Sequence, residues 1–244
     1  MRIAALYDIH GNLPALEAVL AEVRDAKPDA IVIGGDVVPG PMPRECLDLL
    51  RSLNVPMHCI PGNGERVTLA QRQGIEPTEV PEAFREVIRW NASQLTNQDA
   101  KWIESWPKTL SLNNILFCHA SPRNDMDVFT RQTPEEKIVP LFAEVREQLV
   151  VCGHTHMQFN RMVGEKRVVN AGSVGMSFQG TGAFWLLLGD DVQLRRTEYD
   201  LVDAAKRIRA TSYPQAETFA EKNVLHPPTE EQMLAAYAHV PIKV

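Results

Sequence analysis

Long apolar stretches are missing from the sequence. Runs such as 31–33 and 184–188 have the length of a strand, whereas a helix that crosses a membrane needs about 20 apolar residues. The first residues also lack the pattern of a secretory signal. Asp8 stands where the apolar stretch of such a signal continues, and no small-residue cleavage site follows it. We therefore expect a cytoplasmic protein without a membrane segment.

Cysteine pairs and an excess of basic residues are missing too. None of the four cysteines forms a C-x-x-C pair, and three lie in or at the end of apolar runs, where a thiol behaves as a small buried hydrophobe. Lysine and arginine number 25 against 31 aspartates and glutamates, which gives a net charge of −6. This balance disfavours a nucleic-acid polymer as partner, although it leaves room for a local basic patch.

The composition supports a complete hydrophobic core. With 244 residues, 44% of them hydrophobic, the chain can form one large domain or two small ones. Apolar runs alternate with amphipathic patterns in its first 60 residues, predicting strands at 2–7, 30–34 and 55–60 and helices at 13–26 and 43–53. Such alternation indicates parallel strands joined by right-handed crossovers.

The remainder of the chain has a different character. Polar, tryptophan-bearing sequence over 66–107 predicts a helical insertion above the sheet, in which Thr96 caps one helix ahead of Asp99. Further strands are expected at 114–118, 149–152, 157–163, 167–170, 183–188 and 192–199. Glycine-containing turns within the last four predict an antiparallel meander. We expect one domain over 1–200 and a helical extension over 201–244 that packs on it.

Potential metal ligands stand after most of the predicted strands. They are Asp8, His10, Asp36, Asn63, His119, His154 and His156. In sheets built from crossover units, ligands bind in the crevice outside the carboxyl ends of the strands, so these distant residues can converge. Two carboxylates, one amide and four imidazoles suit Mn²⁺, Fe or Zn²⁺. Because seven ligands exceed one tetrahedral site, we expect two ions about 3.5–4 Å apart, bridged by a carboxylate and a hydroxide.

The order of these residues resembles that of the calcineurin-like metallophosphoesterases, in particular their small bacterial and archaeal phosphodiesterase branch. The five motifs are Asp8-Ile9-His10, Gly35-Asp36, Gly62-Asn63, His119 and Gly153-His154-Thr155-His156. The resemblance covers residues 1 to about 200. It implies an α/β fold, a four-layer α/β/β/α sandwich of two mixed β-sheets flanked by helices.

The resemblance also implies which residues hold which ion. One ion takes Asp8, His10, Asp36 and His156, and the other takes Asp36, Asn63, His119 and His154. Asp36 is then the bridge, and Asp36, Asn63 and His119 are the expected catalytic residues. Mn²⁺ is the expected metal, with Fe, Zn²⁺, Ni²⁺ or Co²⁺ as alternatives.

One position departs from the family pattern. Many relatives carry a histidine after the asparagine of the third motif, where it assists the leaving group, whereas Gly64 and Glu65 follow Asn63 here. The missing acid disfavours alkoxide leaving groups more than phosphoanhydrides or aryl esters, whose leaving groups need little protonation. Glu65 can replace it only if its pKa is raised.

Two further residues are candidates for contacts with a substrate. Arg123 follows His119 closely, and a guanidinium suits a non-bridging phosphate oxygen. Arg66 is a weaker candidate for the same role. Asn12 precedes a predicted helix, where it either orients the substrate or caps the helix.

Together these observations predict a binuclear-metal phosphoesterase. It hydrolyses phosphodiester or phosphoanhydride bonds of a small, nucleotide-type substrate through attack by a metal-bridging hydroxide. A non-catalytic metal-binding or scaffold protein of the same fold is the alternative. A nuclease acting on polymers is a third possibility, which the net charge disfavours. The oligomeric state stays open.

Overall fold

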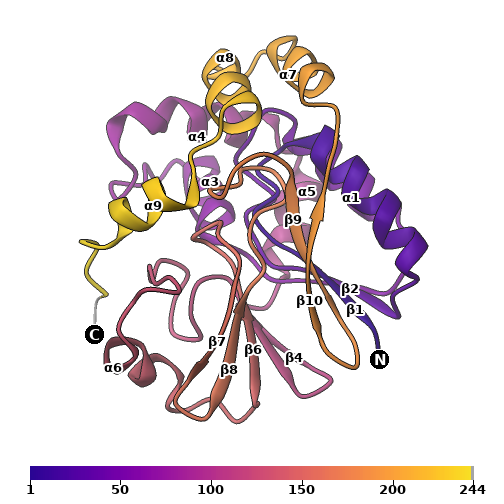
Figure 1. Cartoon of the computed structure of the whole chain (residues 1–244). Coiled ribbons are helices and arrows are strands. Elements are labelled where there is room, and N and C mark those ends of the chain that lie inside the picture. Colours follow the sequence, from indigo (N-terminus) through magenta and orange to yellow (C-terminus); the bar gives the residue numbers. More distant parts are fainter. Residues whose placement is uncertain (243–244) are drawn as a thin grey trace.

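Two five-stranded mixed sheets form the centre of the molecule (Figure 1), in a computed structural model that describes residues 1–242. The first sheet has the order β10-β9-β1-β2-β3. Its strands are β1 (Ile3–Leu6), β2 (Ala30–Ile33), β3 (Met57–Cys59), β9 (Ala183–Leu188) and β10 (Val192–Thr197). β1, β2 and β3 run parallel, and β9 and β10 add an antiparallel hairpin beside β1.

The second sheet has the order β4-β5-β6-β8-β7. Its strands are β4 (Thr109–Leu112), β5 (Ile115–Cys118), β6 (Leu149–Cys152), β7 (Phe159–Val163) and β8 (Lys166–Asn170). β5, β6 and β8 are parallel, and the two edge strands pair antiparallel. An edge strand needs only one partner, which is how the short β4 joins the sheet without a strong apolar pattern of its own.

The two sheets pack face to face because side chains alternate along each strand. In β1, Ile3 and Ala5 point toward the second sheet and contact a cluster that includes Phe117. Ala4 and Leu6 point the other way, into the cluster beneath the helices. β1 is therefore buried on both faces, as the continuous apolar run of its sequence predicts.

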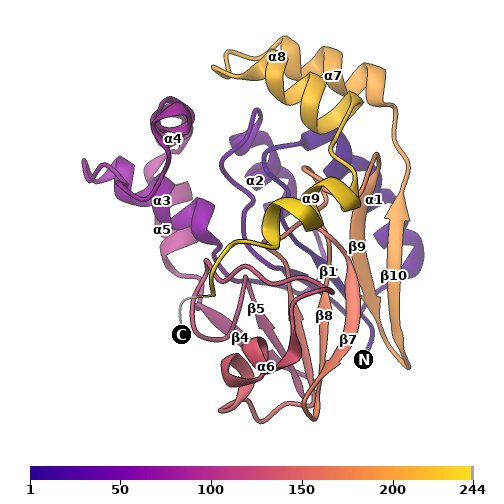
Figure 2. The same ribbon diagram turned by 60° about the vertical axis from the view of Figure 1, so that its left-hand side comes forward.

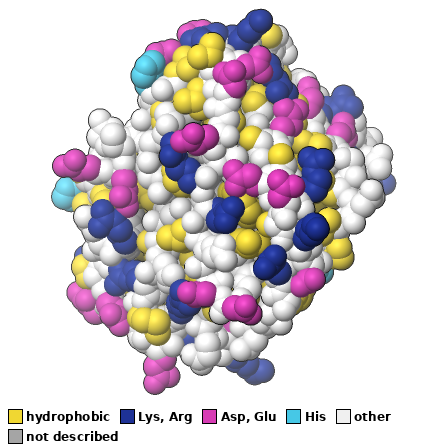
Figure 3. Space-filling model, turned by 45° about the vertical axis from the view of Figure 1, so that its right-hand side comes forward, with side chains coloured by type: hydrophobic (Ala, Val, Ile, Leu, Met, Phe, Trp, Pro, Cys, Tyr) yellow, Lys and Arg dark blue, Asp and Glu magenta, His cyan; other side chains and the backbone are white. Residues whose placement is uncertain are grey.

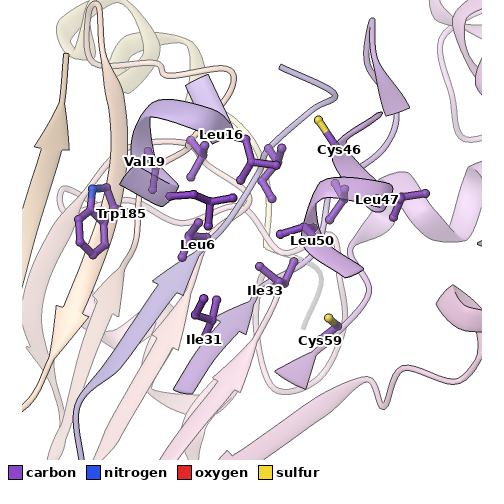
Figure 4. Packing of buried hydrophobic residues seen from close by; sticks show 14 of the residues in the cluster. Leu6, Leu16, Val19, Ile31, Ile33, Cys46, Leu47, Leu50, Cys59 and Trp185 are labelled. Atoms are coloured by element: carbon purple, nitrogen blue, oxygen red, sulfur yellow. The ribbon is translucent and has the colours of Figure 1, made fainter. Parts of the chain in front are cut away.

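Helices cover the outer face of the first sheet. α1 (Leu13–Ala26) and α2 (Pro43–Arg51) bury their apolar stripes against β1 and β2. Figure 4 shows Leu16 and Val19 of α1 beside Leu6, and Leu47 and Leu50 of α2 beside Ile33.

Shorter helices cover the outer face of the second sheet. There α6 (Glu135–Ile138) and the 3₁₀-helix Val139–Phe142 pack on β6 and β8. The fold is thus the predicted four-layer α/β/β/α sandwich, and this prediction is confirmed.

The predicted antiparallel meander over 157–199 is wrong. Both of its hairpins exist, but β7 and β8 belong to the second sheet whereas β9 and β10 belong to the first. Turn residues determine how two neighbouring strands pair and carry no information about which sheet receives them. The third strand is also shorter than the predicted 55–60, and β4 was not predicted.

Three helices follow the third strand. They are α3 (Asn63–Arg72), α4 (Glu82–Gln94) and α5 (Asn97–Glu104). Thr96 caps α5 as expected, because its hydroxyl accepts a hydrogen bond from the backbone N–H of Asp99 at 3.1 Å. Asn63 is the first residue of α3, so the helical stretch begins at a candidate ligand.

The chain ends in a helical extension above the first sheet (Figure 2). It contains α7 (Leu201–Arg209), α8 (Ala216–Phe219), the π-helix Ala220–Leu225 and α9 (Glu230–Tyr237). Ile208 and Phe219 share a buried cluster with Met42 and with Val87 of α4. Of the predicted extension over 201–244, residues 243–244 lie outside the described residues. Within residues 1–242, no helix has both the length and the apolar character for a membrane crossing.

Leu50→Ala tests the packing of α2 on the first sheet. Leu50 is fully buried, and truncation of such a leucine costs roughly 2–5 kcal/mol in the free energy of unfolding. We expect a clearly lower midpoint in guanidinium unfolding. Val202→Ala, at a residue 75% exposed, is the control, and equal midpoints for the two variants would contradict this packing.

Candidate metal centre

The seven candidate ligands gather where the carboxyl ends of the strands from both sheets meet. Asp8 forms two compact groups, one with His10 and His156 and one with Asp36 and His119, in which the ligand atoms lie within 4.8 Å of one another. The other two candidates lie beside His119. Asn63 Oδ1 is 3.1 Å from its Nε2, and the ring of His154 is 5.2 Å away between centroids.

Backbone carbonyls orient three of the imidazoles. Nδ1 of His10, His119 and His156 lies 3.2, 2.9 and 2.7 Å from the carbonyl oxygens of Pro39, Gly34 and Met176. A carbonyl oxygen only accepts, so each Nδ1 carries the proton and donates it. In its neutral form, each of these rings therefore directs the lone pair of Nε2 into the centre. Histidines that bind metals in proteins are held in this way.

Lone pairs consequently face one another across the centre. Nε2 of His10 lies 3.1 Å from Nε2 of His156, and Nε2 of His119 lies 3.1 Å from the amide oxygen of Asn63. Asp8 Oδ1 is buried and lies 3.3 Å from Nε2 of His156, without a hydrogen bond of good geometry. Acceptors held this close are stable only with a cation or a proton between them, so the residues present fit bound divalent cations.

Asp36 lies between the two groups. Its Oδ2 is 3.7 Å from Nε2 of His10, and its Oδ1 is 3.7 Å from Nε2 of His119. Oδ1 also accepts a hydrogen bond from the backbone N–H of Gly64 at 2.7 Å. The two oxygens thus face different histidines, which is the arrangement that a bridging carboxylate needs.

Burial and neighbouring charges together set the protonation of the centre. Burial lowers the pKa of His10 and of His154 to about 3, and the neighbouring histidines His156 and His119, respectively, lower it further. Burial acts in the same direction on His119, but Asp36 and Asp8 outweigh it and raise the pKa of His119. Burial also raises the pKa of Asp36, and Glu65 and Asp8 add to this rise. Burial acts in the same direction on Asp8, but His156 and the other histidines hold its pKa well below the usual value. His10 and His154 are thus neutral at pH 7 and ready to bind a metal.

The backbone at the centre is strained. Among residues 1–242, eight non-glycine residues have a positive φ, and five of them are candidate ligands. These five are Asp8, His10, Asp36, His154 and His156, with φ between 47° and 66°. A left-handed backbone is unfavourable for such residues and is characteristic of functional sites. All five residues lie within four positions of the end of their strand.

Comparison with known proteins agrees with this geometry. A family model described as the calcineurin-like phosphoesterase superfamily domain matches residues 1–190. The chain belongs to this superfamily.

Two solved structures and one curated protein illustrate the similarity. A metallophosphoesterase from Sphaerobacter thermophilus is 25% identical, with a TM-score of 0.75, and the match covers 93% of this chain and 98% of the other. A hypothetical protein from Pyrococcus horikoshii OT3 has a TM-score of 0.79 at 19% identity, covering 93% and 99%. An uncharacterized protein of Methanocaldococcus jannaschii is 27% identical over 243 residues, covering 87% of this chain and 94% of that protein.

Steric crowding excludes a side chain at Gly64 in this structure. A Cβ added to Gly64 would lie 2.2 Å from the carbonyl oxygen of Val38 and 2.8 Å from Oδ1 of Asp36. Real Cβ atoms do not approach other atoms so closely. Any side chain at this position therefore requires the loop after β2 to move.

Glu65 braces the loops that carry the ligands. Its carboxylate is fully buried and accepts hydrogen bonds from the backbone N–H groups of Asp36 at 2.7 Å, Gly62 at 2.8 Å and Val38 at 3.0 Å. Burial does raise the pKa of Glu65, but both oxygens bond to backbone. Its place at the third residue of α3 is a capping-box position, a signal that predicts its hydrogen bond to Gly62 but not those to Asp36 and Val38.

Of its two alternative roles, orienting the substrate or capping a helix, Asn12 has the second. It is fully buried, its Oδ1 accepts a hydrogen bond from the backbone N–H of Ala15 at 3.3 Å, and its Nδ2 donates to the carbonyl of Gly175 at 2.8 Å. Both polar atoms thus bond to the protein. The structure does not bring this side chain into the group of candidate ligands.

Arg123 and Arg66 border a cavity of about 540 Å³ beside His119. Leu69, Ile103 and Trp106 form an apolar part of its lining, and Lys108 adds a third cation. Arg66 forms ion pairs with Glu79 and Asp125. The cavity therefore combines apolar surface with cationic side chains and with the acidic Glu104 and Asp125, next to His119.

Glu65→Gln tests whether the carboxylate of Glu65 holds the ligand loops in place. The amide keeps one oxygen acceptor but turns an N–H₂ group toward backbone donors, and hydrogen bonds to a charged group contribute roughly 1.5–3 kcal/mol. We expect a loss of that size in the free energy of unfolding and weaker Mn²⁺ binding. Glu86→Gln, at an exposed residue of α4, is the control. Unfolding and metal binding equal to those of this control would rule the brace out.

Proposed function

We propose that this superfamily member is a metal-dependent phosphoesterase with two divalent ions, which hydrolyses phosphodiester or phosphoanhydride bonds of a small, nucleotide-type substrate. The observation that carries the proposal is the set of lone pairs facing one another around Asp8 and Asp36. Asp8, His10, Asp36 and His156 hold one ion, and Asp36, Asn63, His119 and His154 hold the other. Asp36 serves both, in keeping with its two oxygens facing different histidines.

The donor set supports the choice of metal. Oxygen and imidazole ligands favour Mn²⁺, with Fe, Zn²⁺, Ni²⁺ or Co²⁺ as alternatives. When bound, such a pair supplies Lewis acidity that activates water and stabilises the charge on the attacking and leaving oxygens. Asp36, Asn63 and His119 would be the catalytic residues, because Nε2 of His119 lies 3.1 Å from Oδ1 of Asn63 and 3.7 Å from Oδ1 of Asp36.

The cavity beside His119 supports the substrate class. Its apolar part, formed by Leu69, Ile103 and Trp106, suits a base or another flat group, and its cations suit phosphate. Arg123 holds a non-bridging phosphate oxygen in this proposal, since a guanidinium bonds such oxygens well. A monophosphate without an organic group would leave the apolar lining unused.

The absence of a side chain at Gly64 supports substrates with good leaving groups. Without a general acid there, the chain gives little help to an alkoxide, whereas a phosphate or aryl oxide leaves without a proton. A phosphoanhydride or an aryl phosphodiester therefore suits the site better than an alkyl ester.

The surface gives no support to a polymeric substrate on the face that includes β10 and α1. There Lys and Arg side chains are interspersed with Asp and Glu (Figure 3), as in the pairs Arg195–Glu22 and Arg207–Glu17. A groove that tracks a nucleic-acid backbone needs a continuous run of cations. A small substrate needs none.

A reducing compartment suits the thiols. All four cysteines are free and buried, as is usual for proteins of the cytoplasm. We therefore propose that the protein acts there.

Asp36→Asn tests the proposed function. Metal-stripped wild-type protein should gain hydrolysis of bis(p-nitrophenyl) phosphate on addition of Mn²⁺. The variant should lose at least roughly 100-fold, more than the loss caused by residues that only orient ligands. Asp25→Asn, at an exposed residue of α1, controls for the change of charge. Stoichiometric Mn²⁺ binding without turnover of this diester or of p-nitrophenyl phosphate would instead favour the non-catalytic alternative.

Arg123→Ala tests the substrate contact. A hydrogen bond between charged groups contributes roughly 1.5–3 kcal/mol, so kcat/KM should fall about tenfold to 100-fold with Mn²⁺ content unchanged. Arg44→Ala, at an exposed residue of α2 outside the cavity, should match the wild type in steady-state kinetics. A kcat/KM for Arg123→Ala equal to this control would remove Arg123 from the site.

A further inference from the structure

The C-terminal extension reaches the metal centre. After the π-helix, α9 runs past the ends of both sheets (Figure 2) and is attached to the loops that border the centre. Glu230 forms an ion pair with Arg131 of the loop after β5, at 2.8 Å. The backbone N–H of Gly180, in the loop between β8 and β9, donates to the carbonyl of Pro228 at 3.2 Å. Leu234 of α9 is buried.

A row of aromatic rings connects α9 with a candidate ligand. The ring of Phe178 lies 4.5 Å from that of His156, and the ring of Tyr237 lies 6.4 Å from that of Phe178. Tyr237 is the last residue of α9 and is half-buried. The ring of Phe178 is in contact with both Tyr237 and His156.

The hydroxyl of Tyr237 makes no hydrogen bond within residues 1–242. Burial raises the pKa of Tyr237 to about 12, and the negative charge of Asp8 contributes to this rise. At neutral pH the phenol is therefore a protonated donor within the electrostatic reach of Asp8.

A hydrogen-bond donor at Tyr237 supplies what the third motif lacks, namely a side chain that can donate to the substrate. Gly64 offers no side chain, and Glu65 is occupied by backbone N–H groups. A substrate phosphoryl group bound at the centre carries oxygens that accept hydrogen bonds from neutral as well as charged donors. Among the groups around His156, the Tyr237 hydroxyl has both a proton to give and no acceptor among the described residues.

We propose that Tyr237 donates a hydrogen bond to an oxygen of the phosphoryl group bound at the metal centre, so that the C-terminal extension completes the active site. The inference rests on the proposed phosphoesterase function. It makes Tyr237 a substrate-binding residue supplied from outside the stretch 1–190 that the superfamily model matches.

Tyr237→Phe tests the proposal, with Tyr213→Phe as its matched control. The substitution keeps the ring that packs near Phe178 and removes only the hydroxyl. Tyr213 lies in the same extension, packs against Trp90 and Phe219, and owes its raised pKa to burial alone. Loss of a hydrogen bond to a charged acceptor should lower kcat/KM for bis(p-nitrophenyl) phosphate about tenfold or more in Tyr237→Phe. Tyr213→Phe should retain the wild-type value.

Binding of inorganic phosphate to the Mn²⁺-loaded protein gives a readout that does not depend on turnover. Calorimetry should show an affinity about tenfold weaker for Tyr237→Phe, with unchanged Mn²⁺ content. If the wild type binds phosphate without hydrolysing esters, the proposed function fails, and the affinities of the two variants still decide the role of Tyr237. Equal phosphate affinities for Tyr237→Phe and Tyr213→Phe would overturn the proposal. So would a defect confined to Tyr237→Ala, because the ring would then act through packing alone.

Discussion

The crowding of buried polar atoms around Asp8 is the constraint on which the candidate metal centre depends. Nε2 of His10 and of His156 face each other at 3.1 Å, and Asp8 Oδ1 is buried without a hydrogen bond of good geometry. A buried acceptor without a partner costs roughly 1–3 kcal/mol, and each left-handed residue costs a similar amount. The two sheets and their covering helices must therefore hold an arrangement that is unfavourable by itself and that a bound cation relieves.

Hydrogen bonds between loops provide the restraint. The backbone N–H of His10 donates to the carbonyl of Asp36 at 2.8 Å within the first sheet, and that of Gly153 donates to the carbonyl of His119 at 2.7 Å within the second. The backbone N–H of His154 donates to Asp8 Oδ2 at 2.9 Å and so joins the two sheets. Because every ligand loop is bonded to another, the centre forms only when both sheets are packed together.

The sequence predicts those features that depend on residues close together along the chain. Strand ends marked by Asp8 and Asp36 and the cap at Thr96 follow from short patterns, and the order of the motifs indicated the fold. The division of β7–β8 and β9–β10 between two sheets did not follow, because turn residues specify only neighbouring strands. The roles of Glu65 and Tyr237 depend on groups that approach from distant parts of the chain, such as the N–H of Asp36 and the ring of Phe178.

The absence of a side chain at Gly64 and the position of the C-terminal extension are related. Asp36 Oδ1 bonds to the backbone N–H of Gly64 at 2.7 Å, and this close approach leaves no room for a Cβ. The loop thus fixes Asp36 through this hydrogen bond, and it has no side chain at Gly64 that could act on the substrate. A further donor can then come from α9, because its ion pair to Arg131, in the loop that carries His119, and its hydrogen bond to the β8–β9 loop fix it beside the centre.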